Sequence, residues 1–536
     1  AIVNHSPYWC RPFWGDSLRE LPARTQELLL EGEDGYICWL PVCAGELKTV
    51  LRGGADGMEL SVSSNLDGMT RCPEQLSFLC MEGKSAAGLL HAIAKTAAGL
   101  LGNGLRMREE RAYPEALGYL GWCSWDAFQI RVSRDGLLEK AREFREKRLP
   151  VHYAIIDDMW ADVPGLNDIP EETSFGDMVK IMHASRLRRF EGDPVRFPGG
   201  MQSAIAALKA AGIPAVGVWF PTTGYWSGME PGGEAERELA DLLVTTEKGL
   251  RIPSPEHDRA GRYFDVLCGK ARAWGADFVK IDNQGFHRNY RGLAAYGQSA
   301  AAIQSAIDGA TERQFGGAVI NCMGMPNECL FHRTKSAVCR CSDDFMPESR
   351  EWFAKNILQC AYNGLLQGQY QVNDWDMWWT DDEQAVKNSL CRAVSGGPIY
   401  ISDRLGRTRP EVLRPLTLSN GRILRCDLSA APTDDCLMHD PTKEHRVFKI
   451  RNRAGESGIL AAFHISAEST PVKGFASPED CGLPVGSYAW YEYFTRAAGI
   501  LPAGGRVEIE LAGNDDFRLY TFVPMPADGV AVLGRT

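Results

Sequence analysis

The 536-residue sequence lacks three features, and each absence argues against a class of protein. None of its sixteen cysteines belongs to a CxxC pair, so zinc-ribbon and thioredoxin-like sites are not expected. Basic residues are not in excess, and the net charge of -11 argues against nucleic acid, whose phosphates require a basic surface. No apolar run is long enough to span a bilayer, so no membrane partner is expected.

No secretion signal is expected either, because the first residues show no basic start followed by an apolar stretch. Many cysteines lie in apolar runs, as Cys38 does between Ile37 and Trp39. This placement favours free core thiols in a reducing cytoplasm, so we expect a cytoplasmic protein. The charge is compatible with a neutral small-molecule partner such as a sugar, and the sequence leaves open whether the protein forms a homo-oligomer.

The length predicts two or three domains, and a hydrophobic content of 44% with 24% charged residues is ordinary for a globular protein. Residues 1–112 are β-rich, with short apolar runs at 35–42 and 58–62 and one Ala/Leu-rich helix at 86–101. The pattern changes at Tyr113-Pro114, and from 113 to 405 strand-like runs alternate with helical segments. Strands return in 406–536, as at 506–511 and 518–523, which predicts a C-terminal β-sandwich to match a sandwich-like N-terminal domain.

The central region predicts a (β/α)8 barrel. Short buried strands separated by helices imply a parallel sheet, and eight such units in about 290 residues match that barrel in number and length. An open doubly wound sheet would need a glycine-rich fingerprint after the first strand, and residues 120–125 contain none. The predicted strands are 117–122, 153–157, 215–220, 278–281, 318–322, 337–340, 370–373 and 398–401. Helices are predicted at 201–211, 259–274, 296–309, 351–363 and 382–393, with another beginning after Ser133.

Active residues of such barrels lie where the strands end. Carboxylates and tryptophans gather at these positions, a mixture that suits a neutral sugar because carboxylates accept hydrogen bonds from hydroxyls and indoles cover the C–H face of a pyranose. Any one of them could instead be a helix cap or a core residue. The candidates are Trp125, Asp157, Asp158, Trp219, Lys280, Asp282, Arg340, Asp343, Asp344, Trp375 and Asp376.

Glycoside cleavage with retention needs one ionised and one protonated carboxyl group. Asp282 is the predicted nucleophile, because Lys280 lies two residues away on the same face of the strand and an ammonium favours the ionised carboxylate. The predicted acid is Asp343 or Asp344, which repel each other while Arg340 opposes protonation of whichever it contacts. Two other chemistries were weighed, a Schiff base on Lys280 and a carboxylate Mg²⁺ site. Aromatic residues are too abundant for either, so no metal and no cofactor are expected.

Six motifs follow one another through the central region: GWCSWDAF at 121–128, IIDD at 155–158, VKID at 279–282, RCSDDF at 340–345, DWDM at 374–377 and GPIYISD at 397–403. They resemble, in order, those of the raffinose synthase and seed imbibition protein family, a branch of glycoside hydrolase family 36 that includes alkaline α-galactosidases. Shorter likenesses at 25–30, 40–41, 421–425 and 434–437 extend the resemblance over nearly the whole chain.

The resemblance implies retaining chemistry on terminal α-galactosides, by hydrolysis or by galactosyl transfer; a sugar-binding homologue without catalysis is the further alternative. It also implies that Asp157 and Asp158 bind the sugar hydroxyls beside Lys280. Trp125 and Trp219 would line the same subsite. Spacing from Arg340 favours Asp344 as the acid, whereas alignment on Ser-Asp favours Asp343. Three departures border this site and leave the leaving group and the sugar open: Met159, the run 219–223 (WFPTT) and Asn283.

Overall fold

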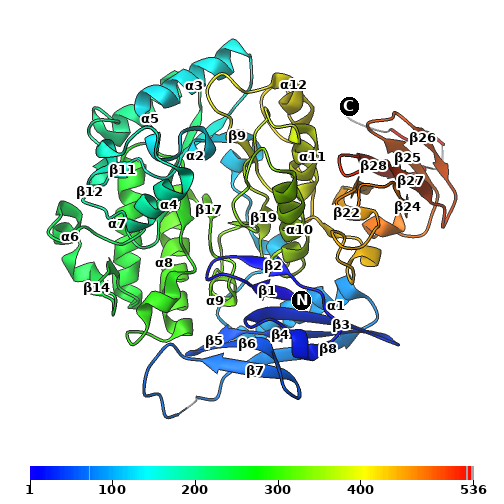
Figure 1. Cartoon of the computed structure of the whole chain (residues 1–536), viewed down its shortest axis with the longest axis horizontal. Coiled ribbons are helices and arrows are strands. Elements are labelled where there is room, and N and C mark those ends of the chain that lie inside the picture. Colours follow the sequence, from blue (N-terminus) through cyan, green and yellow to red (C-terminus); the bar gives the residue numbers. More distant parts are fainter. Residues whose placement is uncertain (72, 527–528, 533–536) are drawn as a thin grey trace.

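The computed structural model describes residues 1–71, 73–526 and 529–532, which form a central region of strands and helices with a β-rich region on each side (Figure 1). In the described part of the chain, no helix combines the length and the apolar composition that crossing a membrane would require. All cysteines there are free thiols and nearly all are buried.

The N-terminal region is an antiparallel sheet in the order β2-β1-β3-β4-β8, with β6 also paired to β3 and extended by β5 and β7. Helix α1 (Ala86–Leu101) packs against this sheet and begins at Ser85, whose side chain accepts a hydrogen bond from Gly88 N. The predicted helix is therefore confirmed. The strands are β1 (Ile2–Asn4), β2 (Cys10–Pro12), β3 (Thr25–Gly32), β4 (Gly35–Pro41), β5 (Cys43–Ala44), β6 (Leu47–Gly54), β7 (Gly57–Ser63) and β8 (Phe78–Gly83).

Eight parallel strands form the central sheet, and each overlaps one of the eight predicted strands. They follow one another in chain order, and the last strand pairs with the first, so the sheet curls back on itself. The backbone ladder is open between the seventh and eighth strands, which are linked by a Tyr400 Oη–Asp374 Oδ2 hydrogen bond of 2.6 Å. The strands are β9 (Leu120–Cys123), β10 (Tyr153–Ile156), β13 (Ala215–Pro221), β16 (Phe278–Asp282), β17 (Val319–Asn321), β18 (Val338–Arg340), β19 (Val372–Asp374) and β20 (Ile399–Ile401).

Long helices surround this sheet (Figure 1). All six predicted helices of the central region are present, and the first begins at Ser133, whose side chain accepts a hydrogen bond from Gly136 N as a helix cap should. They are α3 (Arg134–Glu146), α5 (Gly200–Ala210), α7 (His257–Ala273), α8 (Tyr296–Phe315), α10 (Arg350–Gln367) and α11 (Ala385–Ser395).

Side chains of the central strands alternate between two apolar clusters. Tyr153, Ile155 and Phe278 belong to the cluster inside the curled sheet, whereas Ala154 and Ile156 belong to the cluster between sheet and helices. Glycine makes room for the inner rings: a Cβ at Gly121 would lie 2.1 Å from the ring of Tyr153. The same alternation continues past the strand ends and decides which residues face the mouth of the sheet.

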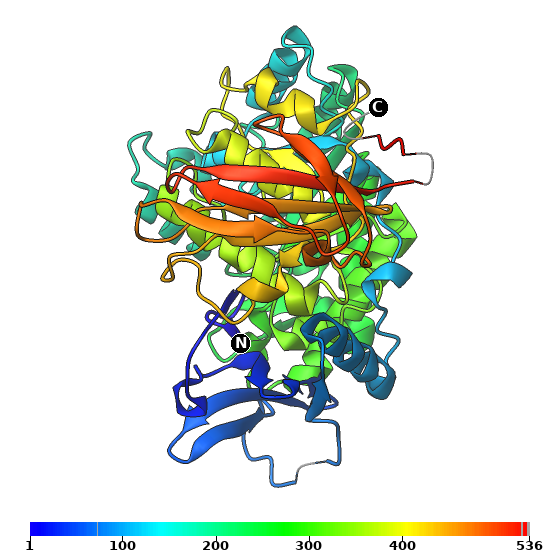
Figure 2. The same ribbon diagram turned by 90° about the vertical axis from the view of Figure 1, so that its right-hand side faces the viewer.

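The C-terminal region is a six-stranded antiparallel sheet in the order β21-β22-β23-β28-β25-β26, together with the pair β24-β27. Figure 2 shows these strands in front of the central helices. Both groups of strands contribute to one apolar cluster, which includes Leu460, Val472, Ile509 and Phe522. The strands are β21 (Ala431–Pro432), β22 (Phe448–Ala454), β23 (Ser457–Phe463), β24 (Val472–Ala476), β25 (Tyr488–Glu492), β26 (Ala498–Leu501), β27 (Val507–Leu511) and β28 (Phe517–Pro524).

Candidate active site

A cavity of about 790 Å³ opens at the C-terminal ends of the central strands. Loops after seven of the eight strands contribute to it, because the carboxyl ends of parallel strands meet at one rim. Eight of the eleven candidate residues line this cavity: Trp125, Asp157, Asp158, Trp219, Lys280, Asp282, Asp343 and Asp344.

Lys280 is paired with Asp157. Its Nζ lies 2.7 Å from Asp157 Oδ2, and both side chains are buried. Burial is the largest single influence and lowers the pKa of Lys280, but the Asp157 carboxylate and other neighbouring groups, including Asp282, together hold that pKa well above its usual value. The Lys280 charge also lowers the pKa of Asp282, as the shared strand face predicted, but its direct ion pair is with Asp157, which follows strand β10.

Asp282 is held by two donors. Trp219 Nε1 donates to Oδ2 over 3.0 Å, and the backbone N–H of Asn283 donates to Oδ1 over 2.7 Å. Burial raises the pKa of Asp282, and the Lys280 charge and these two hydrogen bonds oppose that rise. The carboxyl group is therefore fixed in direction, and it ionises at a higher pH than an exposed aspartate does.

Asp158 accepts two short hydrogen bonds from the loop after β13. Tyr225 Oη lies 2.7 Å from Oδ1 and Trp226 Nε1 lies 2.6 Å from Oδ2. Burial raises the pKa of Asp158 to about 7, although both bonds act to lower it. Tyr225 and Trp226 were not among the candidates, although their position just beyond a strand end could have indicated them.

The backbone after two of these carboxylates is strained. Met159 and Asn283 have φ of 67° and 56°, in the left-handed region that costs a side-chain-bearing residue free energy. In return each N–H points at the preceding carboxylate: Met159 N lies 2.5 Å from Asp158 Oδ1. Two of the three departures from the family pattern therefore lie at positions where the backbone itself holds a carboxylate.

Arg340 and Asp376 lie behind the cavity wall. The Arg340 guanidinium donates to Asp376 Oδ1 over 2.6 Å and to Asp344, while Asp376 Oδ2 accepts from the backbone N–H of Phe345. Neither Arg340 nor Asp376 lines the cavity. Their role in the structure is to orient the loop that presents Asp344.

The two acid candidates differ in their surroundings. Asp344 contacts Arg340 and has a side chain that is 62% exposed to the cavity mouth. Asp343 faces His5 instead, with His5 Nε2 3.2 Å from Asp343 Oδ2, and its side chain is 25% exposed. Of the two adjacent carboxylates, Asp344 is therefore the one that contacts Arg340.

Trp375 is placed outside the cavity. It is 1% exposed and packs with Phe353, Tyr362 and Phe448 in the apolar cluster between α10 and the C-terminal strands. The strand alternation explains this outcome: Asp374 and Asp376 share the inward side, so the residue between them points outward. The expectation that Trp375 lies beside a sugar is corrected accordingly.

Asp126 is a cavity residue that was not a candidate. Ser402 Oγ donates to its Oδ2 over 2.6 Å. Burial raises the pKa of Asp126 to about 8, and neighbouring carboxylates add to the rise. The cavity therefore holds one carboxyl group that is largely protonated near neutral pH. Among the described residues, no group of three or more His, Cys, Asp or Glu is arranged to hold a metal ion.

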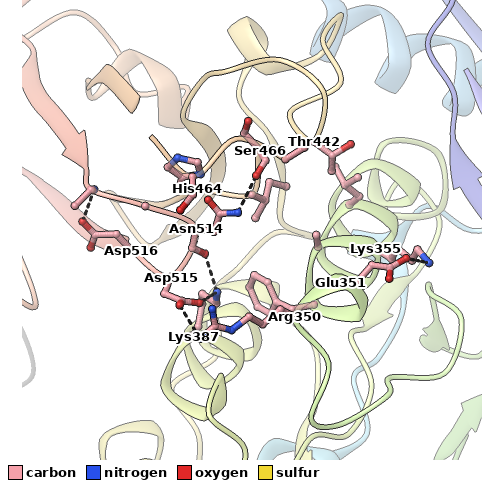
Figure 3. A pocket seen from close by; sticks show the side chains of 18 residues that line it. Arg350, Glu351, Lys355, Lys387, Thr442, His464, Ser466, Asn514, Asp515 and Asp516 are labelled. Atoms are coloured by element: carbon pink, nitrogen blue, oxygen red, sulfur yellow. Dashed lines mark hydrogen bonds and ion pairs between the residues drawn. The ribbon is translucent and has the colours of Figure 1, made fainter. Parts of the chain in front are cut away.

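A second cavity, of about 830 Å³, lies between the helices α10 and α11 and the C-terminal strands (Figure 3). Its charged groups are paired across the cleft: Arg350 Nη2 lies 3.0 Å from Asp515 Oδ2, and Lys387 Nζ lies 3.5 Å from Asp515 Oδ1. Asn514 donates to the carbonyl of Ser466. Most of these groups are exposed, so this cavity offers no pair of buried carboxylates.

The sequence matches the family described as raffinose synthase or seed imbibition protein Sip1 over residues 2–470. A probable galactinol–sucrose galactosyltransferase 6 from Arabidopsis thaliana is 28% identical over 499 residues. That alignment covers 85% of this chain but 66% of the plant protein, slightly under two thirds of its length.

Two solved structures share the fold. A GH27 β-L-arabinopyranosidase from Geobacillus stearothermophilus has a TM-score of 0.53 at 16% identity, over 78% of this chain and 100% of its own. The α-galactosidase I of Mortierella vinacea has a TM-score of 0.50 at 14% identity, over 77% of this chain and 99% of its own. At these identities the likeness shows the arrangement of the backbone alone.

Proposed function

Because this chain belongs to the raffinose synthase or seed imbibition protein Sip1 family, we propose that it is an enzyme that cleaves terminal α-galactosides and passes the galactosyl group to water or to an acceptor. The observation that carries the proposal is the convergence of Asp282 and Asp344 on one cavity, with indoles and further carboxylates around them. The related arabinopyranosidase and α-galactosidase are enzymes on the same fold, which agrees with a glycosidase site at the strand ends.

Asp282 is the proposed nucleophile. Its two donors fix the carboxylate in place, and the Lys280 charge favours the ionised form against the effect of burial. Attack on C1 forms a glycosyl-enzyme, in which configuration is inverted once. A second attack on C1, by water or an acceptor, inverts it again, so the product retains the α configuration.

Asp344 is the proposed acid and base. Its exposure at the cavity mouth allows it to reach the leaving oxygen, and Arg340 orients the carboxyl group. Asp344 donates its proton as the C1–O bond breaks and later takes a proton from the incoming hydroxyl. Asp343 remains the second candidate because it also lines the cavity. Retaining geometry requires the two catalytic carboxyl groups to lie about 5–5.5 Å apart.

The remaining cavity residues would hold the sugar. Asp157 and Asp158 are proposed to accept hydrogen bonds from galactosyl hydroxyls, and Trp125 and Trp219 to cover its apolar face. Lys280 holds Asp157 in place through their 2.7 Å ion pair.

The architecture proposed for this enzyme is a (β/α)8 barrel of residues 113–405 between two β-sandwich domains, 1–112 and 406–536. The shared apolar cluster of the two C-terminal sheets supports the second sandwich. The circular order of the central strands supports the barrel.

Turnover of p-nitrophenyl α-D-galactoside tests the proposal, with and without sucrose as acceptor. Release of p-nitrophenol with α-galactose as first product supports retaining hydrolysis, and a new galactosyl-sucrose supports the transferase alternative. Binding of galactose with no turnover of any α-glycoside would favour a sugar-binding protein instead.

A further inference from the structure

Four consecutive residues of the N-terminal region, Ser6 to Trp9, line the cavity. They form the loop between β1 and β2, far in sequence from every central strand. The loop is held in a tight turn, because the backbone N–H groups of Tyr8 and Trp9 both donate to Ser6 Oγ, over 3.2 and 3.0 Å. Its shape is therefore set within the segment itself.

This loop packs directly on the loops that follow β16 and β17. Met325 N donates to the carbonyl of Tyr8 over 3.3 Å. The chain also passes close to Gly285, three residues after Asp282, where a Cβ would lie 2.3 Å from the carbonyl oxygen of Pro7. Only glycine allows this approach, so the loop and the nucleophile strand have a fixed spacing.

The side chains of the loop extend from the nucleophile to the acid. The guanidinium of Arg288 lies over the ring of Tyr8, 5.7 Å from the ring centroid. Burial is the main cause of a raised pKa of Tyr8, and the negative charge of Asp282 contributes to the rise. At the other end, Arg340 lies 5.0 Å from the ring centroid of Trp9. Arg340 is the residue that contacts Asp344.

The position of the general acid indicates which part of the substrate this loop would contact. A general acid protonates the oxygen of the leaving group, so the leaving group must lie on the side of Asp344. Trp9 stands on that side beside Arg340, and His5 at the start of the same loop contacts Asp343, whereas Asp157, Asp158 and Lys280 line the part assigned to galactose. An indole face with a nearby phenol and guanidinium suits the ring and hydroxyls of a neutral polyol.

We propose that Tyr8 and Trp9 are specificity-determining residues that bind the saccharide or cyclitol on the leaving-group side. The inference rests on the proposed function. In the second half of the reaction the same wall holds the acceptor, whose oxygen attacks C1 while its proton passes to the Asp344 carboxylate. As the new bond forms, the bond from C1 to Asp282 breaks, and its electron pair returns to that carboxylate.

The test compares donors that share galactose and differ in the leaving group: α-galactosyl fluoride, whose fluoride is too small to reach the loop, and raffinose and α-galactosyl-inositol, which are large enough. Removing one stacked ring at Trp9→Leu is expected to lower kcat/KM about 5- to 10-fold for the two larger donors. For the fluoride it should change less than about 2-fold, because the galactose contacts are intact. Tyr8→Phe should show a smaller difference of the same sign.

Trp14→Leu is the matched control, since Trp14 is half-buried in the same N-terminal region, packs on Tyr362 and lies outside the cavity. This substitution should leave kcat/KM unchanged for all three donors. Near-ultraviolet circular dichroism confirms folding, and if Trp9→Leu does not fold, Tyr8→Phe decides. An equal loss of kcat/KM on all three donors, or no loss on any, would overturn this inference and leave the proposed function standing. So would a wild type that uses the fluoride and neither larger donor. A wild type inactive on every α-galactoside, the fluoride included, would refute the proposed function and this inference with it.

Discussion

The two cavities described above differ in chemistry more than in size. The strand-end cavity measures about 790 Å³ and the cleft beside the C-terminal strands about 830 Å³. In the first, Asp157, Asp158 and Asp282 are buried, and each is held by named donors. In the second, Asp515 has a side chain that is 51% exposed, and it is paired with the exposed Arg350 as well as with the buried Lys387.

The difference shows that volume does not identify an active site, whereas convergent buried charge does. Burying a carboxylate costs free energy unless hydrogen bonds and counter-charges compensate. Several such groups on separate strands are therefore unexpected unless they serve a purpose. Surface ion pairs across a cleft cost little and contribute little to stability. The predictions below use this contrast, beginning with the largest effect.

Asp282→Ala should remove nearly all turnover of p-nitrophenyl α-D-galactoside, a loss on the order of 10⁴-fold, because no other group can form the glycosyl-enzyme. Added azide should restore part of the activity and give β-galactosyl azide, since a small anion fits the vacated space and inverts C1 only once. Retained activity without azide would show that Asp282 is not the nucleophile. Asp515→Ala in the second cleft is the control and should turn over normally.

One substitution made in both regions contrasts their electrostatics. Lys280→Met leaves the buried Asp157 without its counter-charge and should lower the free energy of unfolding by about 3–5 kcal/mol. Lys355→Met in the second cleft should change it by less than about 1 kcal/mol, because Lys355 and its partner Glu351 are both exposed. Urea unfolding followed by tryptophan fluorescence measures both. Equal losses would contradict the contrast between the two cavities.

Asp344→Asn should slow cleavage most for poor leaving groups, by roughly 10²-fold or more, because they depend on proton donation. p-Nitrophenolate leaves without that help, so its release should be affected far less. Asp343→Asn is the paired variant, and kcat/KM measured over a series of aryl and sugar leaving groups separates the two. If the steep dependence appears in Asp343→Asn instead, the assignment of the acid is reversed.

Trp219→Phe should move the acid limb of the pH–rate profile upward by about one to two units, because a hydrogen bond to a charged group is worth about 1.5–3 kcal/mol. The sign follows from the role of the group. The nucleophile acts ionised, so activity rises with pH through the pKa of Asp282, and loss of the Trp219 donor raises that pKa further. The profile of kcat/KM between pH 4 and 9 measures the shift. An unmoved limb would show that it belongs to another group.

Much of this site follows from local sequence. All eight central strands were predicted, because each is a short apolar run between helical segments, and the residues just beyond them are the ones that line the cavity. The rule that places strand ends at a common rim then brings Asp157, Asp282 and Asp344 together without any knowledge of their distances. Trp375 was misplaced only because the alternation of inward and outward residues was not carried past the end of β19.

The partners of those residues depend on the folded chain. Only the folded chain shows that Lys280 forms an ion pair with Asp157 and that Arg340 contacts Asp344 rather than Asp343. It also brings Tyr8 and Trp9 of the N-terminal region to the cavity. The Lys280–Asp157 contact and the approach of Tyr8 and Trp9 join segments of different strands and regions, so their distances depend on how the curled sheet and the N-terminal region pack together. Sequence by itself determined the family, the strands and the identity of the carboxylates, because periodicity and motif are local. The tertiary structure decided their ionisation and the wall of the cavity, because charge interactions and burial depend on neighbours in space.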